Sequence, residues 1–182
     1  MELMPTHVVE KNVADERGTL LDFLDAQRGG IRRSVLGLTD EQADATPSAS
    51  ELSLRALLKH AVDGERSWVD RARGLAPENF EESMAQWQAG WRPTEDETVA
   101  ALLARWDEVA ADTERFVLSV NLEDTFPLPD APWFPQASSV SVRWLLLHLI
   151  EEIARHAGHA DIVRESLDGK TAFELLAEQQ AG

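Results

Sequence analysis

Apolar residues recur at helical spacing in four long segments of this sequence, and this periodicity restricts the chain to a helical architecture. Between residues 14 and 38 helical spacing predicts a first helix, with apolar residues at Leu20, Leu24, Ile31, Val35 and Leu38. Ser53 is a suitable N-cap for a second helix, which Gly74 ends. A third helix is expected to begin at the capping-box pattern of residues 94–97 and to continue to Val120.

The fourth helix follows a proline-rich stretch and has a long apolar face. Ser139 or Ser141 is expected to cap it, and it should end near Glu165. The Asp-Gly pair at 168–169 predicts a turn, after which a short last helix begins at Thr171. The sequence thus predicts an all-α fold, most simply a four-helix bundle.

Three shorter stretches depart from this pattern. Residues 122–137 contain four prolines, so they can form neither a helix nor a central strand, and we expect a long loop that serves as a lid or a connector. Residues 75–93 have only loose periodicity. The Gly-Gly pair at 29–30 should weaken the first helix, and residues 39–42 suggest a short capped turn. No segment carries a convincing strand.

Length and composition exclude several classes of protein. The 182 residues suggest a single domain spanning residues 1–182, with residues 1–12 as a mobile N-terminal tail. The absence of cysteine excludes disulfides, thiolate metal ligands and cysteine nucleophiles. A formal net charge of −16 disfavours nucleic acid and anionic membranes as partners. Because the N-terminus lacks a secretory pattern and no apolar run could span a bilayer, we expect a cytoplasmic protein.

The side chains that could carry chemistry gather on one side of the fourth helix. His148, Glu152, His156 and His159 fall within about 80° of one another at about 100° per residue. Apolar residues share this side, so these groups point to the bundle interior, where unpaired polar groups are costly. A bound divalent metal would satisfy them, because ligands four residues apart can grip one ion. His148 and His156 are about 12 Å apart along the helix, so only one neighbouring pair can serve a given ion.

Any further ligand must come from another helix. Outside the fourth helix the only histidines are His7, in the expected tail, and His60, on the second helix. A structural interpretation remains open at this stage. In that interpretation His148 is a core histidine bonded to Glu152, and His159 faces water near the helix end.

Other side chains have candidate supporting roles. Glu65 lies five residues after His60 and could orient its imidazole. The aromatic pair at 133–134, between prolines, could either close over a metal cavity or fix the loop to the bundle. Three further tryptophans at helical spacing are expected in the core or at a subunit interface: Trp68, Trp106 and Trp144.

Three segments resemble the DinB-like superfamily: FLDAQRGGIRRSVLGLTDEQ (23–42), SLRALLKHAVDGERSW (53–68) and VRWLLLHLIEEIARHAGHADIVRESLDG (142–169). Within it they are most similar to a branch of unknown function that is related to the mycothiol-dependent maleylpyruvate isomerases. The resemblance covers nearly the whole chain. It implies a DinB-like four-helix bundle with, in this chain, a long Pro-rich loop and a short C-terminal helix.

The resemblance also implies a metal site. In the superfamily one histidine from the second helix and two ligands four residues apart on the last core helix hold the metal, and these positions correspond to His60, Glu152 and His156. Many members carry histidine in place of Glu152, whereas the maleylpyruvate isomerases carry glutamate there. His159 replaces the glutamine of the common motif, so it either supports a ligand or faces the substrate.

The function implied by the resemblance is that of a metal-dependent transferase or isomerase using a low-molecular-weight thiol such as mycothiol. The donor set suits zinc, nickel or iron and leaves coordination positions open. Two alternatives remain: a metal-dependent hydrolase with a metal-bound water, and a non-catalytic metal- or ligand-binding bundle. Relatives are often dimers and the chain has six tryptophans, so we also predict a homodimer acting on a small-molecule substrate.

Overall fold

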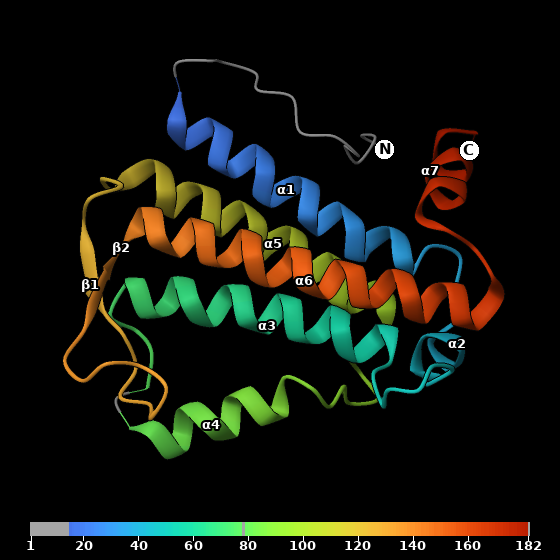
Figure 1. Ribbon diagram of the computed structural model, residues 1–182, viewed down its shortest axis with the longest axis horizontal. Helices are drawn as coiled ribbons and strands as arrows, with labels where there is room; N and C mark the ends of the chain where they lie inside the picture. The colour runs from blue at the N-terminus through green and yellow to red at the C-terminus, as the bar shows by residue number, and fades with distance from the viewer. Residues whose placement is uncertain (1–14, 78, 182) are drawn as a thin grey trace.

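The computed structural model of the protein describes residues 15–77 and 79–181. This part of the chain is mostly helical, which confirms the predicted all-α class (Figure 1). The expected tail at residues 1–12 lies outside the described residues. In chain order the elements are α1 (Glu16–Ser34), α2 (Asp40–Asp44), α3 (Leu54–Ala72), α4 (Phe80–Ala89), α5 (Val99–Ser119), β1 (Thr125–Pro127), β2 (Ser139–Ser141), α6 (Val142–Asp168) and α7 (Ala172–Ala181).

Helices α1, α3, α5 and α6 form the predicted bundle (Figure 1). Helix α6 packs mainly against α1 and also against α3, while α3 packs against α5. The apolar faces that the periodicity predicted meet in one continuous core, whose fully buried members include Leu24, Leu57, Leu58, Trp106, Leu145 and Leu149. The short helix α7 returns against α1. None of the described helices combines the length and the apolar character needed to cross a membrane.

Most helix starts follow the predicted capping chemistry. The hydroxyl of Ser53 accepts a hydrogen bond from a backbone N–H in the first turn of α3, and Ser141 caps α6 in the same way. Thr39 and Gln42 form a reciprocal capping box at α2. These bonds satisfy N–H groups that have no partner within the helix, and so they fix where the site-bearing helices begin.

The predicted start of the third core helix was four residues too early. The backbone N–H of Thr94 donates to Glu97, as in a capping box, but the Thr94 hydroxyl also turns to the Glu97 carboxylate, so Thr94 does not cap. Thr98 is the residue whose hydroxyl accepts from the N–H of Ala101 and opens α5. The pattern therefore marks a turn immediately before the helix.

Three elements were not predicted, namely α4, β1 and β2. Helix α4 lies within the loosely periodic stretch. Its apolar residues Phe80, Met84 and Trp87 recur at helical spacing, but no described residue of the helix is buried, so this face does not belong to the bundle core. Strands β1 and β2 form a two-stranded antiparallel sheet that closes the proline-rich loop, with Phe126 opposite Val140. Each strand has only three residues, too few to show alternation. Pro127 is accommodated because both strands of such a sheet are edge strands.

The Gly-Gly pair in α1 marks a close helix contact. A Cβ atom placed on Gly30 would lie 2.9 Å from the Cβ of Ala157 on α6. A side chain at this position would therefore force α1 and α6 apart. The pair that was predicted to weaken the first helix instead lets it approach the helix that carries the candidate ligands.

Candidate metal centre

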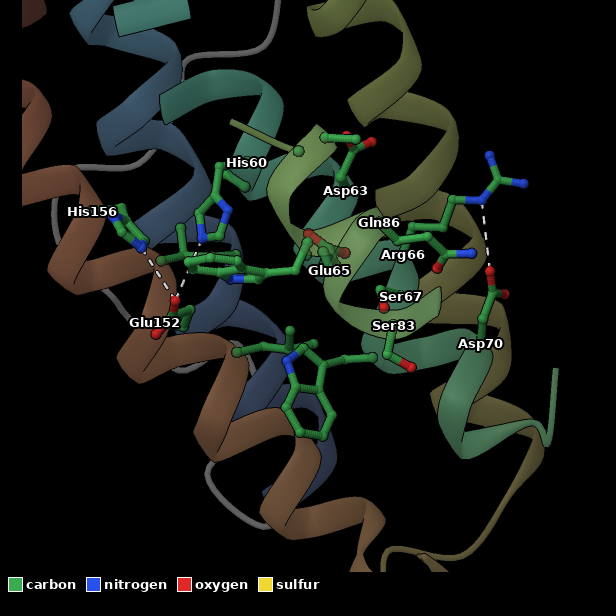
Figure 2. Close-up of a pocket in the computed structure, with 18 residues that line it drawn as sticks. His60, Asp63, Glu65, Arg66, Ser67, Asp70, Ser83, Gln86, Glu152 and His156 are labelled. Atoms are coloured by element: carbon green, nitrogen blue, oxygen red, sulfur yellow. Dashed lines mark hydrogen bonds and ion pairs between the residues drawn. The ribbon is translucent and has the colours of Figure 1, made fainter. Parts of the chain in front are cut away.

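Three predicted ligands converge between α3 and α6. The Nε2 atom of His60 lies 3.6 Å from Oε1 of Glu152, and Nε2 of His156 lies 3.1 Å from the same oxygen (Figure 2). The potential ligand atoms of the three residues all lie within 4.8 Å of one another. Ligand atoms held at about 2.0–2.2 Å from one zinc ion are about 3–4 Å apart, so small side-chain rotations would complete such a site.

Local structure explains this convergence. Glu152 and His156 are four residues apart on α6 and therefore lie one above the other on the same face. His60 is on the inner face of α3, which packs against α6, and both histidines are largely buried. The side chain of Glu152 is 41% exposed, so its carboxylate can be reached from the adjoining cavity. The fold thus brings residues of α3 and α6, which are far apart in the sequence, together at the carboxylate of Glu152.

The surrounding histidines keep Glu152 ionised. Hydrogen bonding to His156 and then to His60 holds the pKa of Glu152 well below its usual range, outweighing the effect of burial. A carboxylate that stays anionic beside two imidazoles is a suitable ligand for a divalent cation.

His159 contacts one of the candidate ligands from behind. Its Nδ1 lies 3.4 Å from Nδ1 of His156, the ring nitrogen that faces away from Glu152. An imidazole that binds metal through Nε2 carries its hydrogen on Nδ1, and the Nδ1 of His159 is placed to accept that hydrogen bond. Of the two roles open to His159, the geometry therefore favours support of His156.

His148 lies in an aromatic cluster, one turn from Glu152. Its ring stacks on Trp144, with centroids 4.8 Å apart, and meets Trp68 edge-on at 4.5 Å. Burial lowers the pKa of His148, which favours the neutral imidazole. Among the described residues no hydrogen bond joins it to Glu152, so the structural role predicted through that bond is replaced by ring packing.

The aromatic pair of the proline-rich loop fixes the loop to its surroundings. Phe134 meets Trp68 of α3 edge-on at 6.4 Å, and Trp133 contacts Phe80 of α4 at 5.8 Å. Of the two roles predicted for this pair, the contacts show attachment to the bundle and to α4.

The prediction that Glu65 orients His60 was wrong. The carboxylate of Glu65 is fully buried and accepts hydrogen bonds from Arg28, Trp106 and Thr113. Five residues along a helix correspond to about 500°, so Glu65 points away from His60 and toward α1 and α5. It belongs to the core of the bundle.

A cavity of about 500 Å³ adjoins the three candidate ligands. Its lining residues come mainly from α3, α4 and α6 (Figure 2). This volume is within the range of small-molecule sites. Besides the three candidate ligands, its polar lining consists of Asp63, Glu65, Arg66, Ser67, Asp70, Ser83 and Gln86, and its larger apolar side chains are Trp68, Trp87, Leu149 and Ile153.

Trp91 is a site residue to which the sequence pattern assigned no role. Its indole ring stacks on His60 with centroids 3.7 Å apart and an interplanar angle of 15°. Trp91 lies two residues after α4 and continues the helical spacing of Met84 and Trp87, but this spacing does not by itself place the ring at the metal site.

The comparisons with known proteins agree with this fold. A crystal structure described as the conserved protein of locus from Enterococcus faecalis has a TM-score of 0.62 and 17% sequence identity, and the similarity covers 86% of this chain and 99% of that chain. At this identity the likeness shows a shared fold only. No curated protein matches the sequence.

The family assignment comes from the sequence itself. The sequence model of the mycothiol-S-transferase family, part of the DinB-like superfamily, matches residues 19–169. This range covers α3, α5 and α6 completely and nearly all of α1. It also contains every residue of the candidate metal centre. The chain therefore belongs to the mycothiol-S-transferase family.

Proposed function

We propose that the protein is a metal-dependent S-transferase or isomerase that uses an external low-molecular-weight thiol, such as mycothiol, at His60, Glu152 and His156. The observation that carries this proposal is the convergence of two imidazole nitrogens and one carboxylate beside a cavity of about 500 Å³. The chain contains no cysteine, so the reacting thiol must come from outside. The family match supports a mycothiol-linked transfer.

The donor set fits a catalytic metal. Two nitrogens and one carboxylate suit zinc, nickel or iron, and three protein ligands leave a position open. A divalent ion bound there would retain an excess charge of about +1, because Glu152 is the only anionic ligand, and this charge would lower the pKa of an incoming thiol.

The cavity walls provide the binding contacts in this proposal. Ser67 on α3 and Ser83 and Gln86 on α4 offer hydrogen-bonding groups to the polar part of the thiol. Leu149 and Ile153 on α6 offer an apolar surface to the second substrate. Helix α4 covers the cavity and limits access of water to the reacting sulfur.

Cobalt loading provides the test. We expect a low-molecular-weight thiol such as mycothiol to produce a strong near-ultraviolet charge-transfer band with the cobalt-loaded protein, because a thiolate would enter the open position. The band should be absent when His156 is replaced by alanine. Absorption spectroscopy during a thiol titration measures the effect, and thiol-dependent consumption of an electrophile is then assayed with the same protein.

The other outcomes identify the alternatives. Ester or amide hydrolysis without a thiol, together with a cobalt spectrum that thiols leave unchanged, would replace the transferase with a hydrolase. A spectrum that neither thiols nor small anions perturb would indicate a coordinatively closed, structural metal.

We further propose that the whole chain forms one domain that assembles as a homodimer in the cytoplasm. Large apolar side chains are exposed on the outer side of α6, where Leu147 is 51% and Ile162 60% exposed, and Phe23 of the neighbouring helix α1 is 42% exposed. Burial of this surface would favour association. A cytoplasmic location fits the need for a reduced thiol.

Light scattering tests the assembly. At tens of micromolar protein we expect twice the mass of one chain, and replacing Ile162 with glutamate should shift the mass toward one chain because a charge would have to be buried. A monomer mass for the unmodified protein at this concentration would contradict the homodimer.

A further inference from the structure

Trp91 touches both histidines of the candidate metal centre. Its ring lies nearly parallel to His60 at a centroid distance of 3.7 Å, and it meets His156 edge-on at 5.5 Å and 68°. The two imidazoles meet each other at 4.8 Å and 77°. Three aromatic rings therefore form one packed cluster beside the carboxylate of Glu152.

Ring packing, and not hydrogen bonding, sets the position of Trp91. Its indole nitrogen is buried but has no hydrogen-bond partner within residues 15–77 and 79–181. The ring is partly buried against the core, and its further aromatic contact is Trp87, edge-on at 6.3 Å. Because the indole N–H makes no hydrogen bond, the stacking contact with His60 is the main interaction that positions the ring.

We propose that Trp91 is a positioning residue of the metal centre. Its face holds the imidazole of His60 with Nε2 directed at Glu152, and its edge limits rotation of His156. A free imidazole would lose side-chain freedom on binding a metal, whereas an imidazole already stacked in the ligating orientation loses less. This inference rests on the proposed metal site at His60, Glu152 and His156.

Metal affinity tests the proposal without reference to activity. Trp91→Leu keeps an apolar side chain but removes the aromatic face, and Trp91→Phe keeps the face. We expect Trp91→Leu to bind cobalt about 10-fold more weakly than the unmodified protein, the effect typical of residues that orient metal ligands, and Trp91→Phe to restore most of the affinity. Competition with a chromophoric chelator measures the affinity, and the visible cobalt spectrum reports the change in ligand geometry.

The control is Trp133→Leu, the same substitution at a tryptophan whose described ring contacts are Phe80 and Phe134. It should bind cobalt as the unmodified protein does. The role of Trp91 would be overturned if Trp91→Leu bound cobalt as tightly as the unmodified protein does. It would also be overturned if Trp133→Leu or Trp91→Phe lost as much cobalt affinity as Trp91→Leu. Each of these results would leave the metal centre intact. Failure of the unmodified protein to bind any divalent metal would overturn the metal centre and this inference together.

A second measurement does not depend on the folding of variants. In the metal-free protein the ring protons of His60 should be shifted upfield in NMR spectra, because the indole lies over them at 3.7 Å. His148 should show a similar shift from Trp144, on which it stacks, whereas His159 should not. A His60 resonance at its ordinary position would show that the stacking does not occur in solution.

Discussion

Replacing His60, Glu152 or His156 with alanine should each remove most of the metal that the protein carries after purification. The three residues supply one ligand atom each, and these atoms lie within 4.8 Å of one another. Loss of one ligand leaves only two, because the group contains no fourth His, Asp or Glu among the residues that the structure describes. Elemental analysis of each purified variant gives the metal-to-protein ratio directly.

His148→Ala is the matched control for this prediction. It removes a histidine from the same face of the same helix, four residues from Glu152, yet its ring packs against Trp68 and Trp144. It should therefore retain the metal. If His148→Ala lost the metal and His60→Ala retained it, the ligand assignment would be wrong. Circular dichroism of each variant distinguishes loss of the site from loss of the fold.

The ligands were predictable to different degrees. The spacing of four residues places Glu152 and His156 on one helix face. Because His148 and Glu152 have the same spacing, only the family resemblance selected Glu152 and His156 as the candidate pair. The sequence alone limited the third ligand to one of the two histidines outside that helix. Only the family resemblance paired His60 with Glu152. Pairing between helices is a tertiary property that local periodicity does not contain.

The parts of the structure that escaped prediction depend on tertiary contacts. Met84, Trp87 and Trp91 recur at helical spacing, but the sequence does not show that this segment packs beside the candidate ligands. The early prediction for α5 failed because Thr94 and Thr98 both offer capping hydroxyls, and only the direction of each hydroxyl separates turn from helix start. The sequence indicated only that Gly30 should weaken its helix. The close contact of Gly30 with Ala157 could not be predicted, because the two residues are far apart along the chain.

Glu65 was predicted to orient His60, but its actual surroundings in the bundle core imply a large effect on stability. Arg28 donates to both carboxylate oxygens, at 3.0 Å and 2.5 Å, Trp106 donates its indole N–H at 2.9 Å and Thr113 its hydroxyl at 2.7 Å. These donors come from α1 and α5, so one carboxylate on α3 links three bundle helices. The side chain of Glu65 is inaccessible to solvent and that of Arg28 is 6% exposed.

Glu65→Leu should therefore lower the free energy of unfolding by about 3–5 kcal/mol, the usual cost of leaving one partner of a buried ion pair uncompensated. The nearest remaining acid is Asp25, 3.7 Å from Arg28 but largely exposed, so it offsets little of this loss. The double variant Arg28→Met/Glu65→Leu should lose less than Glu65→Leu alone, because replacing both charges by apolar groups removes the unpaired guanidinium.

Urea denaturation measures all three proteins, with Glu114→Leu as the control for loss of an exposed glutamate on α5. That control should change the free energy of unfolding by no more than about 0.5 kcal/mol. The decisive comparison is between Glu65→Leu and the double variant. If the double variant were the less stable of the two, the cost would come from losing the charge pair itself; if it recovered stability, the cost would come from the stranded Arg28. Because Glu65 bonds to Arg28, Trp106 and Thr113 and to none of the three candidate ligands, a folded double variant should still carry metal, which separates the stability of the bundle from the assembly of the site.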